Sequence, residues 1–165
     1  MSTRQKNEFE SIVNEILNNN KFKELDNELH HGITRYGHSV RVAKATYKCT
    51  KAMKMDYKTA TRAALLHDFF TTEDVKDLKG KENAYEHPLI AAENANNEFG
   101  INTKEKNIIE AHMFPLTHVM PKYKESWVVT CVDKGVALYE MYRFKCSLVI
   151  SIWAIFFFNM ITLQK

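Results

Sequence analysis

Apolar residues recur every three or four positions along almost the whole sequence, which is the period of an α-helix with one buried face. Near the N-terminus Phe9, Ile12, Val13 and Ile16 follow this pattern and lead into an asparagine run at 18–20. Five glycines and three prolines in 165 residues argue against long loops and β-rich folds. We find no convincing strand. The sequence therefore predicts an all-α bundle of about seven helices.

The same period, together with capping residues, places the other helices. They are expected at about 37–53, 58–67, 88–99, 102–115 and 122–144. Pro88 is expected at the first position of its helix, where its missing N–H costs nothing, after a charged loop over 71–87. Asn102 and Glu105 resemble a capping box. We expect a single domain over residues 1–165, with its core at about 30–140.

Residues 148–163, LVISIWAIFFFNMITL, are almost wholly apolar. Sixteen residues fall short of the ~20 that a spanning helix needs. We interpret 147–165 as a last helix packed into the domain, with membrane contact or a hydrophobic partner surface as the alternative. An apolar terminal helix would also fit a homodimer.

Charge and cysteine usage narrow the class of protein. The net charge of +3, from 23 basic and 20 acidic residues, is too small to argue for a nucleic-acid partner and does not oppose an anionic substrate. Cys49, Cys131 and Cys146 are odd in number and lack CxxC spacing, so we expect reduced, buried thiols. The N-terminus has no apolar signal core. A cytoplasmic location is the expectation.

Histidine and aspartate occur on helical faces that are otherwise apolar. Ala60, Ala63 and Ala64 share a face with His67, which ends that face and precedes Asp68. Both polar groups are costly to bury unless each has a partner. In the stretch AALLHDFF, six apolar residues enclose this imidazole and carboxylate.

Two further polar residues lie on inward faces, His112 beside Ile108 and Asp133 between Val129 and Val136. Buried imidazoles and carboxylates together favour a divalent metal, because these groups suit Mn, Fe, Zn or Ni. The candidate ligands come from well-separated segments, which a helical bundle can gather in its core. They are His38, His67, Asp68, His87, His112 and Asp133.

This ordered set resembles the HD superfamily of metal-dependent phosphohydrolases. Its H…HD…D signature matches His38 in RYGHSVRVA, His67-Asp68 in ALLHDFF and Asp133 in VVTCVDKGVALYE, and the likeness covers about residues 30–140. His87 in YEHPLIAA and His112 in IIEAHMFPLT extend the order to H…HD…H…H…D. That order is similar to the branch with two-metal sites, which includes bacterial diadenosine tetraphosphate hydrolases.

The resemblance implies an HD-domain helical bundle with two divalent ions, such as Mn, Fe, Ni or Mg. One ion would be held by His38, His67, Asp68 and Asp133, and the other by His87 and His112, with Asp68 bridging. The implied enzyme cleaves a phosphoester or phosphoanhydride bond of a nucleotide or related small phosphate with a metal-activated water. Asp68 is expected to be catalytic, together with Lys134 and Arg41, which are expected to hold phosphate oxygens.

Other interpretations remain open at this point. A non-catalytic metal-bound HD module could bind a nucleotide or protein partner, and a two-iron HD oxygenase uses a similar ligand order. His87 could be a surface residue near a helix start, and His112 a hydrogen-bonded core histidine. Arg41 and Lys134 could be solvated basic residues.

Overall fold

The structure is a computed structural model that describes residues 1–30 and 33–162, without the side chains of 29, 30, 81 and 147–162. The described part of the chain is built from α-helices, which confirms the all-α prediction. They are α1 (Thr3–Asn18), α2 (Asn20–Glu24), α3 (Arg35–Ala52), α4 (Tyr57–Leu66), α5 (Lys81–Phe99), α6 (Thr103–Ala111) and α7 (Lys124–Thr162). Two 3-10 turns, Leu25–Asn27 and Glu73–Val75, lie between them.

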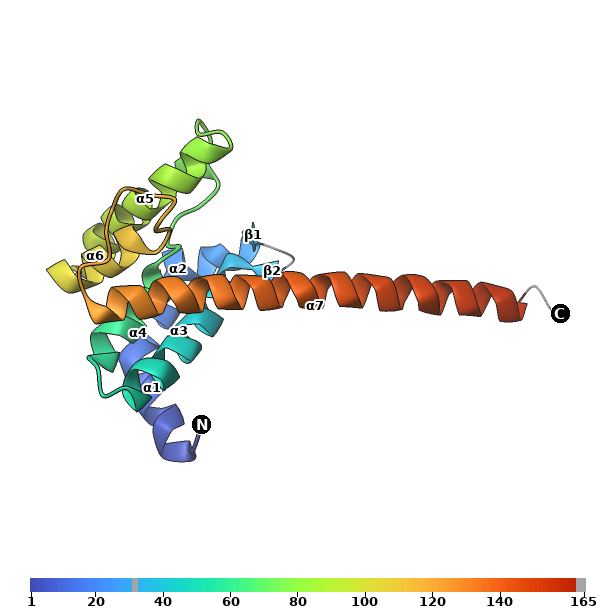
Figure 1. The fold of residues 1–165 in the computed structure, drawn as a ribbon, viewed down its shortest axis with the longest axis horizontal. Coiled ribbons are helices and arrows are strands. Elements are labelled where there is room, and N and C mark those ends of the chain that lie inside the picture. Colours follow the sequence, from blue (N-terminus) through green and yellow to red (C-terminus); the bar gives the residue numbers. More distant parts are fainter. Residues whose placement is uncertain (31–32, 163–165) are drawn as a thin grey trace.

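The helices pack around one apolar core. Helix α3 packs against both α4 and α7, α4 packs against α6, and α6 contacts α5 and α7. Phe22, Leu25, Tyr47, Leu65 and Ile108 are fully or almost fully buried in this core. Figure 1 shows α7 crossing the bundle and continuing past the other helices. This arrangement brings the C-terminal ends of α4 and α6 toward the first half of α7.

Local capping explains several helix ends. Asn102 accepts from the Glu105 N–H while the Glu105 side chain accepts from the Asn102 N–H, which confirms the predicted capping box. Gly100 ends α5 in the left-handed region, with φ of 61°, as expected of a C-terminal glycine. Ser2 and Gln5 form a second capping box at the start of α1.

The structure corrects several predicted boundaries. Helix α5 begins at Lys81, so Pro88 lies inside it and the charged loop is shorter than expected. Glu, Ala and Lys in the segment 81–87 favour a helix. The helix continues through Pro88 despite the loss of the one backbone hydrogen bond that proline cannot donate. Helix α6 ends at Ala111, four residues before Pro115.

Two other expectations were wrong. A two-residue antiparallel pair joins β1 (Leu29–His30) to β2 (Ile33–Thr34), too short to leave an alternating pattern in the sequence. All three cysteines are free, as predicted, but Cys49 and Cys131 are exposed rather than buried.

The apolar run 148–163 begins in the distal part of α7. Its predicted packing, with the alternatives of a membrane or partner contact, falls on side chains outside the described part. Among the residues that the structure describes, no helix is both long enough and apolar enough to span a membrane.

A partly buried hydrogen-bond network centred on Glu8 joins α1 to α3 and α4. The hydroxyls of Tyr47 in α3 and Tyr57 in α4 each donate to the Glu8 carboxylate at 2.7 Å, and the Lys51 ammonium donates as well. Hydrogen bonds from Lys51, then Tyr57 and Tyr47, lower the pKa of Glu8 from 4.5 to about 2. The Glu8 carboxylate is therefore more stable in the folded chain than in the unfolded one.

Replacing Glu8 by Gln should lower the free energy of unfolding at neutral pH and have little effect in acid. A depressed folded-state pKa contributes stability that is fully present above the unfolded value of 4.5 and is lost as pH falls through about 2. Urea unfolding of both proteins between pH 2 and 7 measures this difference. Glu10→Gln, an exposed carboxylate on the same helix, is the control. A wild-type advantage that stays constant across this range contradicts the prediction.

Candidate metal centre

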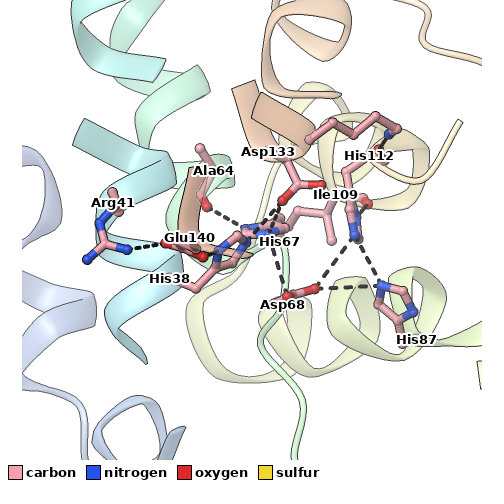
Figure 2. Close-up of polar contacts among 11 residues, drawn as sticks. His38, Arg41, Ala64, His67, Asp68, His87, Ile109, His112, Asp133 and Glu140 are labelled. Atoms are coloured by element: carbon pink, nitrogen blue, oxygen red, sulfur yellow. Dashed lines mark hydrogen bonds and ion pairs between the residues drawn. The ribbon is translucent and has the colours of Figure 1, made fainter. Parts of the chain in front are cut away.

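The six predicted ligand side chains come from five helices or helix ends and lie together in the core (Figure 2). Each is buried or nearly so. His38 lies in α3, His67 is the C-cap of α4 and precedes Asp68, His87 lies in α5, His112 is the C-cap of α6, and Asp133 lies in α7. The fold thus gathers residues that are far apart in the sequence.

One half of the centre surrounds Asp133. Its Oδ1 lies 3.0 Å from His38 Nε2 and 3.4 Å from His67 Nε2. His67 Nε2 also lies 3.6 Å from Oδ2 of Asp68. His38, His67 and Asp68 each offer a ligand atom within 4.8 Å of the others, as do His67, His112 and Asp133.

The other half surrounds the second oxygen of Asp68. Oδ1 lies 3.6 Å from Nε2 of His87 and 3.6 Å from Nε2 of His112. The two Nε2 atoms are 3.1 Å apart. Asp68 therefore presents Oδ2 to His67 and Oδ1 to the His87–His112 pair, which places it between the two halves (Figure 2).

Hydrogen bonds at Nδ1 orient three of the histidine rings. Nδ1 of His67, His87 and His112 lies 2.7–2.8 Å from the carbonyl oxygens of residues 64, 83 and 109, respectively. A carbonyl can only accept, so each Nδ1 carries a proton, and in the neutral ring Nε2 is an unprotonated donor to a metal. Within the part of the chain that the structure describes, His67 Nε2 is buried and has no hydrogen-bond partner.

These atoms fit a divalent cation. Two unprotonated nitrogens facing each other at 3.1 Å cannot share a hydrogen bond. Two adjacent nitrogen ligands at ~2.1 Å from one ion lie about 3.0–3.4 Å apart, depending on the coordination geometry. Imidazole nitrogen with carboxylate oxygen suits Mn, Fe, Zn or Ni. Asp68 has an oxygen for each half, so the donor set can hold two ions.

Charge within the cluster shifts the pKa values of its members in opposite directions. Burial opposes the charged form of His67, but Asp68 and Asp133 outweigh it and raise the His67 pKa to about 9. Burial and repulsion from His67 lower the pKa of His112 to about 3. Burial works against the Asp133 carboxylate, yet His38 and His67 hold its pKa well below the usual value.

Metal binding at pH 7 should displace about one proton from His67, because that ring is protonated in the metal-free protein. Calorimetric titration of Mn²⁺ into metal-free protein, in two buffers with different ionisation enthalpies, measures the release. His67→Gln should abolish this proton release. Equal release by the wild type and the variant would contradict the assignment of the proton to His67. Since the His67 pKa is raised, its contribution to metal-free stability is fully present below pH 6.5 and is lost as pH rises through about 9.

The two predicted phosphate-binding residues, Lys134 and Arg41, differ from each other in their contacts. Lys134 Nζ donates to the carbonyl of His112 at 2.8 Å, so its ammonium lies beside the centre. Burial lowers the pKa of Lys134. Arg41 instead donates to Glu140 and has 41% of its side chain exposed. The roles of both residues in phosphate binding stay predictions.

Two residues near the centre were not singled out in the sequence. Glu140 is buried and bonds Nδ1 of His38 at 2.8 Å, and its position two helical turns after Asp133 was the available signal. Arg35 lies over the ring of Phe70 at 3.9 Å, and that ring is 5.0 Å from the ring of His87. Arg35 is one turn before His38, but nothing in the sequence indicated that its side chain is buried.

Comparison with known proteins gives one family. A family model described as HD domain matches residues 35–137, more than half of the chain. The matched range contains all six candidate ligands. No curated protein and no solved structure matches the chain.

Proposed function

The chain belongs to the HD domain family, a superfamily of metal-dependent phosphohydrolases, and we propose that it hydrolyses a phosphoester or phosphoanhydride bond of a nucleotide or related small phosphate. The observation that carries this proposal is the position of Asp68. Its two carboxylate oxygens face two separate sets of imidazole nitrogens. A structural site would need one closed set of ligands rather than two sets that share a carboxylate.

Each of the six candidate ligands is assigned to one of two ions in this proposal. His38, His67 and Asp133 would hold one ion, His87 and His112 the other, and Asp68 would bridge them. Divalent ions bound there would supply a nucleophile from water near neutral pH and would offset negative charge on the phosphoryl oxygens. The carbonyls that accept from Nδ1 keep three of the rings in the tautomer that can bind metal.

An anionic substrate also needs positive charge beside the metals. Lys134 supports this role, because its ammonium is held at the His112 carbonyl and is close enough to Asp133 to interact with it. Burial lowers the pKa of the His87 ring, and Arg35 lies close enough to add a smaller contribution in the same direction. Both cations are at least partly buried, where their attraction to a phosphate is stronger than in bulk water.

The proposal is tested with a panel of nucleoside phosphates and dinucleoside polyphosphates, assayed for phosphate or nucleotide release with Mn²⁺, Fe²⁺, Ni²⁺ or Mg²⁺. Metal content is measured on the same sample, and about two ions per chain are expected. Turnover of at least one substrate that depends on added metal supports the proposal. Stoichiometric metal with no hydrolysis would favour a non-catalytic module, and oxygen uptake by the iron-loaded protein would favour an oxygenase.

A further inference from the structure

We propose that Glu140 is a positioning residue that fixes His38 for metal binding, and that Arg41 is the counter-ion of Glu140 rather than a contact to substrate phosphate. The proposal rests on the metal-binding half of the proposed function. It gives a role to a buried carboxylate outside the six candidate ligands.

Both ring nitrogens of His38 lie close to carboxylate oxygens. Its Nδ1 lies 2.8 Å from Oε2 of Glu140, and its Nε2 lies 3.0 Å from Oδ1 of Asp133. Glu140 and Asp133 are seven residues apart on α7, so both point from the same face of that helix toward α3. The His38 ring is therefore held between two carboxylates of one helix (Figure 2).

His38 differs from the other three histidines in that the partner of its Nδ1 comes from another helix. His67 and His112 cap the C-terminal ends of α4 and α6, where the last carbonyls lack intrahelical partners and can accept from Nδ1. His87 lies inside α5 and bonds the carbonyl of residue 83 in its own helix, whereas His38, inside α3, bonds a carboxylate of α7. Of the four histidines in the centre, His38 is the one whose Nδ1 bonds a carboxylate.

A carboxylate that accepts from Nδ1 fixes the tautomer of a histidine more strongly than a carbonyl does. A charged acceptor makes a shorter and stronger hydrogen bond, so Glu140 holds the proton on Nδ1 and keeps Nε2 as the metal-binding nitrogen. Such a partner also makes the imidazole a better electron donor, and losing it commonly costs 10–100-fold in metal affinity.

The Glu140 carboxylate in turn needs a neutralising charge, because its side chain is 1% exposed. Arg41 supplies that charge by donating from Nη1 to Oε1. Arg41 lies one turn after His38 on α3, so the ion pair also ties α3 to α7. Figure 2 shows Arg41 on the opposite side of His38 from Asp68 and His87, away from the second half of the centre.

The test uses Glu140→Gln and Arg41→Gln, with Mn²⁺ titrated into the metal-free full chain. Glu140→Gln should weaken Mn²⁺ binding by about 10–100-fold. Arg41→Gln should weaken it in the same direction by a smaller factor, and the double variant should lose less than the product of the two single losses. Glu10→Gln and Arg143→Gln, which make the same chemical changes at exposed positions, are the controls.

A spectroscopic readout separates positioning from general stability. Nitrogen-15 spectra of the histidine rings should show His38 protonated at Nδ1 in the metal-loaded wild type and a mixed or altered state in Glu140→Gln. Unchanged Mn²⁺ affinity together with an unchanged His38 spectrum overturns the proposal. If Glu140→Gln does not fold, Glu140→Asp, which keeps the charge but shortens the reach, should show the same weakening, and wild-type affinity in that variant overturns it.

Arg41 is tested separately with inorganic phosphate as the ligand of the metal-loaded protein. The proposal expects Arg41→Gln to bind phosphate as wild type does once Mn²⁺ is saturating. A tenfold loss of phosphate affinity with unchanged Mn²⁺ affinity would make Arg41 a substrate contact and overturn its role as counter-ion. Neither titration depends on turnover, so a protein that binds metal without hydrolysing anything would refute the proposed function and leave this inference standing.

Discussion

Replacing Asp68 by Asn is expected to reduce the rate of phosphate release by at least about 10³-fold while leaving the helical content unchanged. Metal ions supply several kcal/mol of transition-state stabilisation, and each ~1.4 kcal/mol corresponds to a tenfold change in rate. Asn keeps the shape of Asp68 but has one oxygen and no negative charge, so it cannot serve both halves of the centre. The bound metal should also fall below the wild-type content.

Phosphate release, metal content and far-ultraviolet circular dichroism are measured on the same preparation of this variant. Asp77→Asn is the matched control, because Asp77 is an exposed carboxylate in the neighbouring loop. It should retain wild-type rate and metal content. An Asp68→Asn protein that still turns over substrate within tenfold of wild type would remove the bridging role and the mechanism built on it.

Removing the divalent ions with a chelator should abolish hydrolysis and lower the midpoint of thermal unfolding by about 5–10 °C. A ligand present at 100 times its Kd stabilises the native state by about 2.7 kcal/mol. A domain of this size loses about 2–4 °C for each kcal/mol. The effect is expected because the six ligands join five helices or helix ends, and the metal-free centre leaves carboxylates and imidazoles facing one another.

Calorimetric scans with and without chelator measure this shift, and adding Mn²⁺ back should restore both midpoint and activity. The same scans of Asp68→Asn should show a smaller response to Mn²⁺. Equal midpoints for the metal-loaded and chelated wild type would mean that the centre is preformed without metal and gains nothing from it.

The helical period and the H…HD…D order carried most of what could be predicted. His67 was placed correctly because its face is defined by Ala60, Ala63 and Ala64 within the same helix, and such short-range patterns are local. The convergence of His38 and Asp133 followed from the family resemblance. Periodicity placed Asp133 on an inward face but could not bring it to His38.

What could not be predicted depends on tertiary packing. Whether Arg41 turns toward substrate or toward Glu140 is decided by where α7 crosses α3, and no short-range pattern encodes that crossing. Pro88 was misplaced because its local preference for a first turn was overridden by a longer helix. Glu140 was overlooked because a glutamate on a long helix is most often a solvated residue.

The path of α7 has a mechanical consequence. The rod that supplies Asp133 and Glu140 continues unbroken to Thr162, about 33 Å beyond Glu140 at the rise of an α-helix. A hydrogen-bonded rod passes torque along its axis, so twisting its far end would swing both carboxylates about the imidazole of His38. Force applied to the distal part of α7 would thus reach the candidate metal centre.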